Sequence, residues 1–508
     1  MCIKSLYMSM DDKQQQPTVL TPLLLEVEHF DALDARTRRV LDKIGRAADR
    51  LGLVAYAVGG FVRDVILGRP LKDIDIVTVG SGIALAEAVR KWYAKDSSLA
   101  VYRKFGTARI YMEGYEIEFV GARKESYRHD SRKPQVEQGT LEDDQLRRDF
   151  TINALYYVLN GPDKGKLIDP FGGMRDIELK IIRTPTDPAR TFSDDPLRML
   201  RAIRFAVQLG FTIHPRTKEG ILQSAHRIEI VSAERISDEL QKIMRTDKPS
   251  RGFMLMDELG LLQYILPELQ ALKGVEWREG IGHKDNFYHS LKVLDNVAAK
   301  TKNEPDKKLW LRWAALLHDI GKAPTKRFHP KEGWTFHGHE VVGARMVKTV
   351  FKRLRLPLDN RFKYVQKLVR HHLRPISLTK DDITDSAIRR LIFDMGDDLE
   401  DLLLLCEADI TSKNPHKVRR YLDNYRIVRQ RIKEVEEKDR IRNWQPPIDG
   451  EEIMRTFGIP PSKPVGIIKN AIKDAILDGV IPNTYEAARA FMIEKGRSLG
   501  LTPITEEE

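Results

Sequence analysis

Apolar residues recur along this chain in two rhythms, one typical of strands and one typical of helices. Short runs rich in Val and Ile, at 53–58 and 73–79, predict two strands. Longer periodic segments at 32–51 and 82–95 predict helices, and from about residue 186 onward the pattern is almost wholly helical. These patterns predict a mixed α/β domain followed by an α-helical body.

Shorter segments complete the expected organisation. Two more strands are expected near 107–112 and 115–120, and the polar, basic segment 121–145 is interpreted as a mobile loop beside the active site. Proline-bearing turns mark the expected domain boundaries near 185–188, 267–282 and 445–447. A length of 508 residues allows several domains.

Composition narrows the class of protein. The chain is 42% hydrophobic and 31% charged with a net charge of +11, which indicates a globular protein and favours a polyanionic partner. Its two cysteines, Cys2 and Cys406, exclude a disulfide framework and fit a reducing compartment, so a cytoplasmic location is expected. The sequence contains no apolar run of about 18 residues, so no membrane span is expected. The first 17 residues lack the apolar core of a signal peptide and are interpreted as a disordered arm.

The segment AYAVGGFVRDVILGRPLKDIDIVTVG carries the first candidate chemistry. Asp73 and Asp75 are two residues apart on a predicted strand, so their carboxylates are expected on one side, where they suit Mg²⁺ bound together with substrate phosphates. Gly59 and Gly60 let the backbone approach a phosphate closely, and Arg63 can donate hydrogen bonds to phosphate oxygens. Together they predict a metal-dependent site for a nucleoside triphosphate. An isolated pair of aspartates would more often solvate an edge strand, and neither GxGxxG nor GxxxxGK[ST] occurs.

Two further features can complete this site. In LRRDFTINAL, at 146–155, Arg148 is a candidate clamp for the triphosphate, and Asp149 and Asn153 are expected to share one helical face. The alternative for this segment is a helix cap with surface arginines. Glu118 on a neighbouring strand is either a third carboxylate facing the metal or an ordinary solvent-facing glutamate.

The segment SDDPLRMLRAIRFA, at 193–206, is a candidate reader of the nucleotide base. Asp195 and Arg198 are three residues apart on a predicted helix and are expected to face the same way. An acceptor beside a donor matches the Watson–Crick edges of cytosine and adenine and leaves unpaired groups against guanine and uracil. Arg201 continues the same stripe. The alternative is an amphipathic helix with arginines on its wet face.

A second cluster of candidate ligands lies in the helical part of the chain. His318 and Asp319 end the apolar segment LRWAALLHDIGK, and other ligands lie before and after it in the order H…HD…H…HH…D. The members are His289, His318, Asp319, His339, His371, His372 and Asp409. Imidazole and carboxylate together suit Mn²⁺, Fe²⁺, Ni²⁺ or Mg²⁺ better than a structural zinc. Any one of these histidines alone is more often a surface residue or a satisfied core residue.

The order and spacing of the first motifs resemble those of the class II tRNA nucleotidyltransferases, which include CCA-adding enzymes, and of the related bacterial poly(A) polymerases. The matching segments are GGFVRD with KDIDI, RRDFTINAL, DPFGGMRDIELKIIR, DDPLRMLRAIRFA and ERISDEL, which together cover residues 54–240. The resemblance implies untemplated transfer of CMP, CMP and AMP from CTP and ATP to the 3′ end of tRNA.

The same resemblance implies roles for individual residues. Asp73 and Asp75 match the family's Mg²⁺ ligands. Its triphosphate contacts match Gly60, Arg63 and Arg148, and its protein template for ATP and CTP matches Asp195, Arg198 and Arg201. One departure is Asp194, where a glutamate is more usual.

The second cluster resembles the HD-domain metal phosphohydrolases over about residues 285–412. That resemblance implies His289, His318, Asp319 and Asp409 as core ligands of a divalent metal. His339, with His371 or His372, would be added if a second metal binds. Such a site implies hydrolysis of a phosphoester. The segment from PPIDGEEIM to NTYEAA resembles the tail of family members that carry an HD domain, although Ser462 replaces the usual glycine of its turn.

The expected architecture is an α/β nucleotidyltransferase head followed by an all-α neck, an HD-type helical body and a helical tail. The expected ranges are a flexible arm at 1–28, the head at 29–185, the neck at 186–266, the HD-type domain at 267–420 and the tail at 421–508. The expected function is CCA addition to tRNA by two-metal nucleotidyl transfer. The alternatives are a poly(A) polymerase, an enzyme that adds only CC or only A, and an HD phosphohydrolase whose head serves to bind RNA.

Overall fold

The computed structural model describes residues 23–128, 131–378, 384–412, 414–439 and 444–504. These residues form two compact units. The first unit extends to Thr246 and also contains Arg251–Ile265, and the second contains Asp247–Ser250 and continues from Leu266. The predicted arm lies outside the described residues as far as residue 22.

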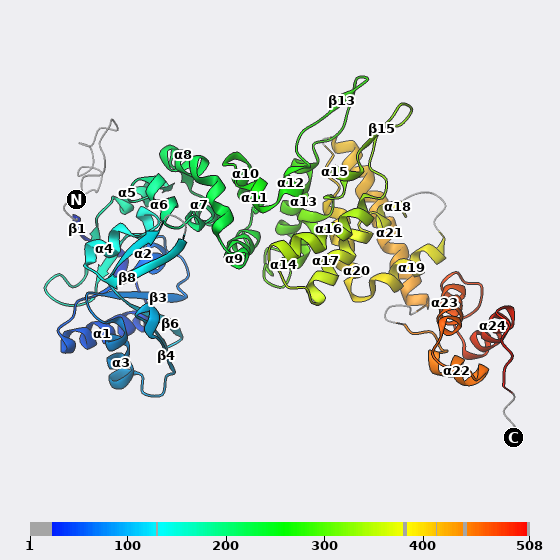
Figure 1. The fold of residues 1–508 in the computed structure, drawn as a ribbon, viewed down its shortest axis with the longest axis horizontal. Helices are drawn as coiled ribbons and strands as arrows, with labels where there is room; N and C mark the ends of the chain where they lie inside the picture. Colours follow the sequence, from blue (N-terminus) through cyan, green and yellow to red (C-terminus); the bar gives the residue numbers. More distant parts are fainter. Residues whose placement is uncertain (1–22, 129–130, 379–383, 413, 440–443, 505–508) are drawn as a thin grey trace. The chain divides into compact units, whose positions relative to one another are not determined.

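An eight-stranded sheet forms the centre of the first unit (Figure 1). In spatial order its strands are β1 (Leu23–Glu26), β10 (Lys166–Asp169), β9 (Tyr156–Val158), β2 (Ala55–Val58), β3 (Asp73–Thr78), β6 (Tyr115–Gly121), β5 (Thr107–Met112) and β4 (Leu99–Tyr102). Neighbouring strands are antiparallel except β3 and β6, which are parallel; the chain runs from β3 through α3 (Gly82–Tyr93), β4 and β5 before it reaches β6. The predicted order of strands and helices in this domain is confirmed.

Helix α1 (Ala35–Leu51) shows how the local sequence sets the limits of an element. Its first turn is capped by Asp34, whose carboxylate accepts a hydrogen bond of 2.7 Å from the Thr37 N–H. Gly52 ends it in the left-handed conformation at φ +64°. The buried face of α1 includes Val40 and Ile44, and α1 packs against both α3 and β2. Buried apolar area on this face stabilises the head far more than helix propensity does.

Two expectations for the head are wrong. Residues 23–28 were expected to belong to the flexible arm, but Leu23–Glu26 pair with β10 at the edge of the sheet. The segment 121–145 was expected to be a mobile loop, but it contains β7 (Arg123–Arg128), β8 (Ser131–Gln138) and α4 (Leu141–Leu146). The polar sequence conceals β7 and β8 because they pair with each other as a separate two-stranded sheet and do not join the main sheet.

Helices continue the first unit after the sheet. They are α5 (Gly173–Leu179), α6 (Pro188–Asp194), α7 (Leu197–Leu209), α8 (Pro215–Ser224), α9 (Ala233–Met244), α10 (Ser250–Glu258) and α11 (Leu262–Ile265). Helix α7 is central, because it packs against α9 and buries most of its side chains. Two arginines of α7 also contact the segment after α4: Arg198 donates to the Arg147 carbonyl oxygen, and Arg201 donates to Asp149.

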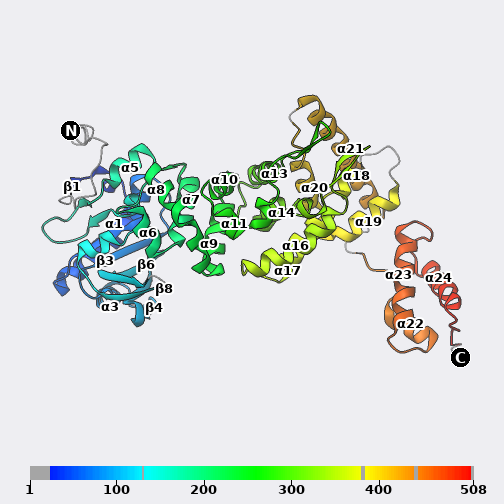
Figure 2. The ribbon, with the colours of Figure 1, turned by 45° about the horizontal axis from the view of Figure 1, so that its top comes forward.

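The second unit is almost wholly helical (Figure 2), with two short hairpins that include β13 (Trp277–Arg278) and β15 (Arg327–His329) (Figure 1). Its main helices are α13 (Asn286–Lys300), α14 (Leu309–Leu317), α16 (His339–Arg353), α17 (Asn360–His371), α19 (Asp385–Met395), α20 (Leu399–Ala408) and α21 (Pro415–Asp439). The hairpins pair β13 with β14 (Ile281–Gly282), and β15 with β16 (Gly333–Thr335). Trp313, Phe287 and Phe351 lie in the core that α13, α14, α16 and α17 enclose.

Three helices end the described chain: α22 (Gly450–Phe457), α23 (Lys463–Leu477) and α24 (Tyr485–Ser498). They enclose a separate apolar cluster that includes Ile453, Ile468 and Met492. Arg390 of α19 joins this group to the rest of the unit through ion pairs with Asp474 and Asp478 at 3.1 and 2.8 Å. Among the described residues, no helix has both the length and the hydrophobicity needed to cross a bilayer.

Candidate functional site

The turn from β2 into α2 (Gly59–Ile66) is the meeting point of the first candidate site. Gly59 has φ +68°, a left-handed conformation that residues with a Cβ disfavour. A Cβ atom added at Gly59 would lie 3.4 Å from Asp75 Oδ2 and 3.6 Å from Arg148 Nη1. Gly59 therefore allows a carboxylate and a guanidinium from two other segments to approach the same turn.

Four carboxylates lie together on β3 and β6. These strands run in register, so Asp73 lies beside Glu116, and Asp75 lies beside Glu118 on the same face of the sheet. Arg109 of β5 lies 2.6 Å from Glu116 and 3.8 Å from Glu118, and it offsets part of the charge. Burial raises the pKa of Asp75, and the neighbouring Glu118 and Asp73 raise it further. A set of oxygen ligands with excess negative charge fits a divalent cation such as Mg²⁺.

Arg148 is held in place by a buried acid. Its Nε and Nη2 donate to Asp144 Oδ2 at 3.1 and 2.7 Å, and the Tyr156 hydroxyl donates to the same oxygen at 2.8 Å. Arg147 also donates to Asp144, from Nε at 2.8 Å. Burial alone would raise the pKa of Asp144, but the two arginines outweigh burial and lower it to about 2. Asp144 is therefore an anion that fixes Arg148 while leaving Nη1 directed to the Gly59 turn.

A chain of hydrogen bonds links the head to α7. Arg63 Nη1 donates to Asn153 Oδ1 at 2.8 Å, and Asn153 Nδ2 donates to Asp149 Oδ1 at 3.0 Å. Asp149 Oδ2 then accepts from Arg201 Nε and Nη2 at 2.8 and 2.6 Å. The guanidiniums of Arg63 and Arg201 both lie over the Phe205 ring, at 4.9 and 5.4 Å from its centre. Two arginines from distant parts of the sequence are thereby brought together.

The expectation that Asp149 and Asn153 share a helical face is wrong. Helix α4 ends at Leu146, and Asn153 lies in a 3₁₀ turn at Thr151–Asn153. The two side chains still meet, because the chain folds back between them and their amide and carboxylate pair directly. The sequence spacing therefore brings the residues together through a turn rather than an α-helix.

Asp195 and Arg198 are not arranged as the sequence predicted. Asp195 lies in the link between α6 and α7 with φ −140° and ψ 101°, the extended conformation that the following Pro196 favours. Its carboxylate accepts from Arg235 Nη2 at 2.8 Å. Arg198 lies on α7 and donates to the carbonyl oxygens of Arg147 and Thr191 at 2.7 and 3.3 Å.

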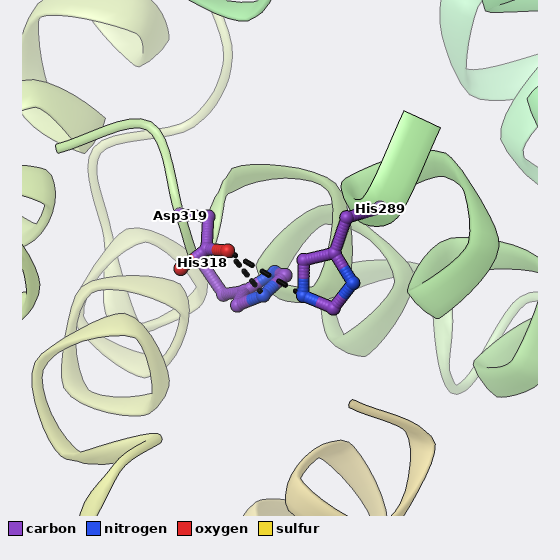
Figure 3. Close-up of side chains that lie close together, drawn as sticks. All are labelled: His289, His318 and Asp319. Carbon is purple, nitrogen blue, oxygen red and sulfur yellow. Dashed lines mark ion pairs between the residues drawn. The ribbon is translucent and has the colours of Figure 1, made fainter. Parts of the chain in front are cut away.

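The second candidate site brings together side chains from five helices or helix ends. Three of these side chains, His289, His318 and Asp319, are drawn in Figure 3. Asp319 lies at its centre. Its Oδ2 lies 3.3 Å from His318 Nε2 and 3.5 Å from His289 Nε2, whereas its Oδ1 lies 3.3 Å from His339 Nε2 and 3.7 Å from His372 Nε2. Asp409 Oδ1 lies 2.7 Å from His289 Nε2. Asp319 thus has one pair of imidazoles beside each of its two oxygens, so that each half of the cluster offers three ligand atoms that could hold a divalent metal.

The imidazoles are oriented by their outer nitrogens. The Nδ1 atoms of His318, His339 and His372 lie 2.7–2.8 Å from carbonyl oxygens, and Nδ1 of His289 lies 2.9 Å from the Thr411 hydroxyl. The Nε2 atoms of His318, His339 and His372 are buried, and none has a hydrogen-bond partner among the described residues. Burial lowers the pKa of His372 to about 4, so this imidazole is neutral at pH 7. Imidazoles held from behind, with inward nitrogens unsatisfied, fit divalent metal ions.

The structure separates His371 from His372. His372 is buried in the cluster, whereas the His371 ring lies 3.4 Å from Arg374 and lines a groove between α16 and α17. Of the two alternatives for a second-metal ligand, only His372 therefore joins the other ligands in the described structure.

Sequence reasoning missed several residues that the structure brings to these sites. In the first unit they are Asp144, Tyr156 and Arg235, and in the second unit they are Lys284 and Lys322. Lys322 Nζ donates to Asp319 Oδ2 at 2.7 Å, and it lies three residues after Asp319 in the sequence. That spacing was a visible signal. The role of Asp144 was visible only in part, as an acid four residues before Arg148.

Comparison with known proteins identifies three matching segments. Residues 55–183 match the poly A polymerase head domain, and residues 210–273 match the probable RNA and SrmB-binding site of polymerase A. Residues 286–414 match the HD domain. The first segment contains the candidate metal and triphosphate residues, and the third contains the HD ligands, whereas Asp195, Arg198 and Arg201 lie between the first and second segments.

Relatives of known name match most of the chain. An A-adding tRNA nucleotidyltransferase of Deinococcus radiodurans is 33% identical over 69% of this chain and 79% of its own length. A multifunctional CCA protein of Pseudomonas fluorescens is 33% identical over 72% of this chain and 87% of its own. A CC-adding tRNA nucleotidyltransferase of Thermus thermophilus is 30% identical over 86% of this chain and 93% of its own.

The fold is also shared with solved structures. A CCA-adding enzyme in its apo form II matches 94% of this chain and 99% of its own with a TM-score of 0.64, at 22% sequence identity. The expected fold class, an α/β head followed by helical domains that include an HD domain, is confirmed. The chain belongs to the tRNA nucleotidyltransferase family, in which it is an enzyme that combines a polymerase head with a fused HD domain.

Proposed function

We propose that this enzyme adds CMP, CMP and AMP to the 3′ end of tRNA, using CTP and ATP without a nucleic-acid template. The observation that carries the proposal is the approach of Asp75 and Arg148 to the Gly59 turn, which joins a carboxylate and a cation at a turn that a phosphate can approach. The names of the relatives support tRNA as the partner. A cytoplasmic location fits both the proposed action on tRNA and the reducing compartment that the two cysteines indicate.

The head residues divide the task of binding the nucleotide. Mg²⁺ held by Asp73 and Asp75 would neutralise phosphate charge while the tRNA 3′ hydroxyl displaces pyrophosphate. Arg148 offers Nη1 to the triphosphate, because Asp144 occupies its other nitrogens. We assign Gly59, Gly60 and Arg63 to the same phosphates, and Asp149 and Asn153 to holding Arg63 and Arg201 in position.

Selection of the base is assigned to Asp195, Arg198 and Arg201. Asp195 accepts a hydrogen bond from Arg235 and Arg198 donates to backbone oxygens, so both groups already have partners within the protein. In the proposed complex the base's amino group replaces Arg235 at Asp195, and the ring nitrogen accepts from Arg198. A bound base must replace the existing hydrogen bonds of Asp195 and Arg198. A base with the wrong donor pattern breaks these bonds without replacing them, so the two side chains are left unsatisfied.

Partial addition is the nearest alternative. The relative from Deinococcus radiodurans is named for adding A, and the relative from Thermus thermophilus is named for adding CC. A poly(A) polymerase is the other alternative, because its head has the same family model. These reactions differ in which nucleotide each tRNA end accepts and in whether extension stops.

We further propose that the HD domain is a metal-dependent phosphohydrolase. His289, His318, Asp319 and Asp409 would hold one divalent metal, and His339 and His372 would hold a second through the other oxygen of Asp319. A metal held there supplies Lewis acidity for attack of water on a phosphoester. The mixed imidazole and carboxylate ligands suit Mn²⁺, Ni²⁺, Fe²⁺ or Mg²⁺.

The decisive experiment supplies the nucleotides one at a time. Purified enzyme is incubated with tRNA that lacks CCA, tRNA ending in C, or tRNA ending in CC, together with CTP, ATP or both. We expect CTP to add two residues, ATP to add one residue to the CC end, and extension to stop there. Asp75→Asn should abolish both additions while tRNA binding is retained. Addition of C alone, addition of A alone, or a long adenylate ladder would each replace the proposal by the matching alternative.

Hydrolysis is tested in parallel. We expect 2′,3′-cyclic nucleotides to be hydrolysed with Mn²⁺, Ni²⁺ or Mg²⁺. Hydrolysis without any nucleotide addition would instead favour an HD phosphohydrolase whose head only binds RNA.

A further inference from the structure

A basic groove lies on the second unit between α16 and α17, and neither proposed reaction uses it. The groove has a volume of about 410 Å³ and is open to solvent. Its walls carry Arg345 from α16 and Lys363, Lys367, Arg370 and His371 from α17, and Ala344 contributes to its floor. We name it the α16–α17 groove.

The charge of this groove is not balanced. Each of the two helices carries four Lys or Arg, and Glu340 is the acidic residue of the pair. Among the described residues, none of those lining the groove is acidic. Lys367 donates to Asp398 at 2.8 Å, but the exposed Arg345, Lys363 and Arg370 form no ion pair within the described chain. Cations held close together without a counter-charge favour binding of a polyanion.

The arrangement fits a string of phosphates better than a single small anion. Lys363, Lys367 and Arg370 are spaced i, i+4 and i+7 on α17, so they form one stripe about 10 Å long. Arg345 faces this stripe from the other wall. One phosphate group cannot contact cations along that whole length, whereas consecutive phosphates of a nucleic-acid strand can.

The groove adjoins the HD cluster. His371 lines the groove, and the next residue, His372, is buried among the candidate metal ligands. Likewise α16 begins at His339, a second candidate ligand, and reaches the groove at Val341. An anionic strand lying in the groove would therefore pass beside the HD centre.

We propose that the α16–α17 groove binds the phosphodiester backbone of RNA. This proposal rests on the proposed action on tRNA, because it adds a docking surface on the HD-bearing unit for the same partner. The bound backbone exchanges its counterions for Arg345, Lys363 and Arg370, so binding through the groove must depend on salt.

The test compares two triple variants with the same change in charge. The groove variant is Arg345→Glu, Lys363→Glu and Arg370→Glu. The control is Lys292→Glu, Lys417→Glu and Arg419→Glu, three exposed cations elsewhere on the second unit. Binding of labelled tRNA is measured by fluorescence anisotropy over a range of salt concentrations. We expect the groove variant to bind about tenfold more weakly and its salt slope to fall by about 2, at roughly 0.7 per phosphate.

Further readouts separate the possible failures. The neutral triple Arg345→Gln, Lys363→Gln and Arg370→Gln should weaken binding in the same direction, and all variants should melt near the wild-type temperature. Equal weakening by the groove and control variants would assign the effect to net charge and overturn the proposal. If the wild type extends tRNA and the groove variants bind tRNA as tightly as the wild type does, the proposed role of the groove is overturned but the proposed function stands. Absence of both binding and extension by the wild type would overturn the proposed function itself.

Discussion

Asp144 shows how one buried side chain fixes the position of an arginine. It is fully buried, and it accepts hydrogen bonds from Arg147, Arg148 and Tyr156. Two nitrogens of Arg148 are occupied by these contacts, so the third, Nη1, is left near Gly59 and Asp75. Asp144 thus acts through Arg148, and we infer that it is a positioning residue.

Asp144→Asn tests this inference. The variant keeps the size of the side chain but removes the charge that pairs with two arginines, so Arg148 is no longer fixed. We expect KM for both CTP and ATP to rise and the free energy of unfolding to fall by about 3 kcal/mol. Steady-state kinetics and denaturant unfolding measure the two effects. A loss of stability with unchanged KM would show that Asp144 is only structural.

The same carboxyl group gives a pH dependence. Its folded pKa of about 2 lies below the ordinary value of 3.8, so its charge stabilises the native state above pH 4. This contribution, about 2 kcal/mol, is lost as the pH falls from 4 toward 2. The stability difference between the wild type and Asp144→Asn should therefore be constant above pH 5 and shrink below pH 4.

Gly59 tests the close approach at the turn. Gly59→Ala places a Cβ in the left-handed region and 3.4 Å from Asp75 Oδ2, so we expect it to lose about 1–2 kcal/mol of stability and most nucleotide addition. Gly52→Ala is the matched control, since Gly52 has φ +64° and a Cβ there would meet nothing within 4 Å. Equal activity of the two variants would contradict the assignment of Gly59 to the site.

At the scale of elements, the sequence was most informative where apolar residues are periodic. The Val- and Ile-rich runs identified β2 and β3, because burial against α1 and α3 demands those residues. The hairpin of β7 and β8 was not predicted, because it lies outside the main sheet and its sequence has no apolar stripe. The position of Asp195 was predicted wrongly because Pro196 separates α6 from α7. Asp195 and Arg198 are therefore not on one helix, and a spacing of three residues does not place them on one helical face.

The residues of the candidate sites, like the elements, were predictable only in part. Residue types and their order indicated which side chains would gather, because metal and phosphate sites require particular donors. Their supporting partners could be predicted only in part. Asp144 lies four residues before Arg148 and Lys284 lies five residues before His289, whereas Arg235 reaches Asp195 only through the tertiary fold. The choice between His371 and His372 likewise depended on which way the end of α17 faces.

The end of α17 provides a prediction about metal content. His372→Gln removes one of the two imidazoles beside Asp319 Oδ1, whereas His371→Gln alters the groove side of the same helix end. We expect His372→Gln to lose about one equivalent of Mn²⁺ per chain, because a three-ligand half-site then has two ligands. Metal analysis after gel filtration in Mn²⁺ measures this number. Equal metal loss by both variants would contradict the assignment of His372.

At the scale of the whole molecule, the two candidate centres belong to different compact units. The head residues from Gly59 to Arg235 lie in the first unit, and all the HD ligands lie in the second. No residue belongs to both clusters. Each unit also has its own buried core, so that the ligands of one centre do not build the other.

This separation predicts that the two activities can be removed independently. His318→Ala with Asp319→Ala deletes ligands of both half-sites, so phosphohydrolase activity should vanish while nucleotide addition persists, because sites without shared partners contribute independently. Bound metal stabilises the unit that holds it, by about 2.7 kcal/mol at a hundredfold excess over Kd. Melting temperature is therefore measured with both activities, so that loss of stability is told apart from loss of chemistry. Should the double variant melt normally yet fail to extend tRNA, the HD centre must take part in nucleotide transfer, and two independent centres would no longer describe this enzyme.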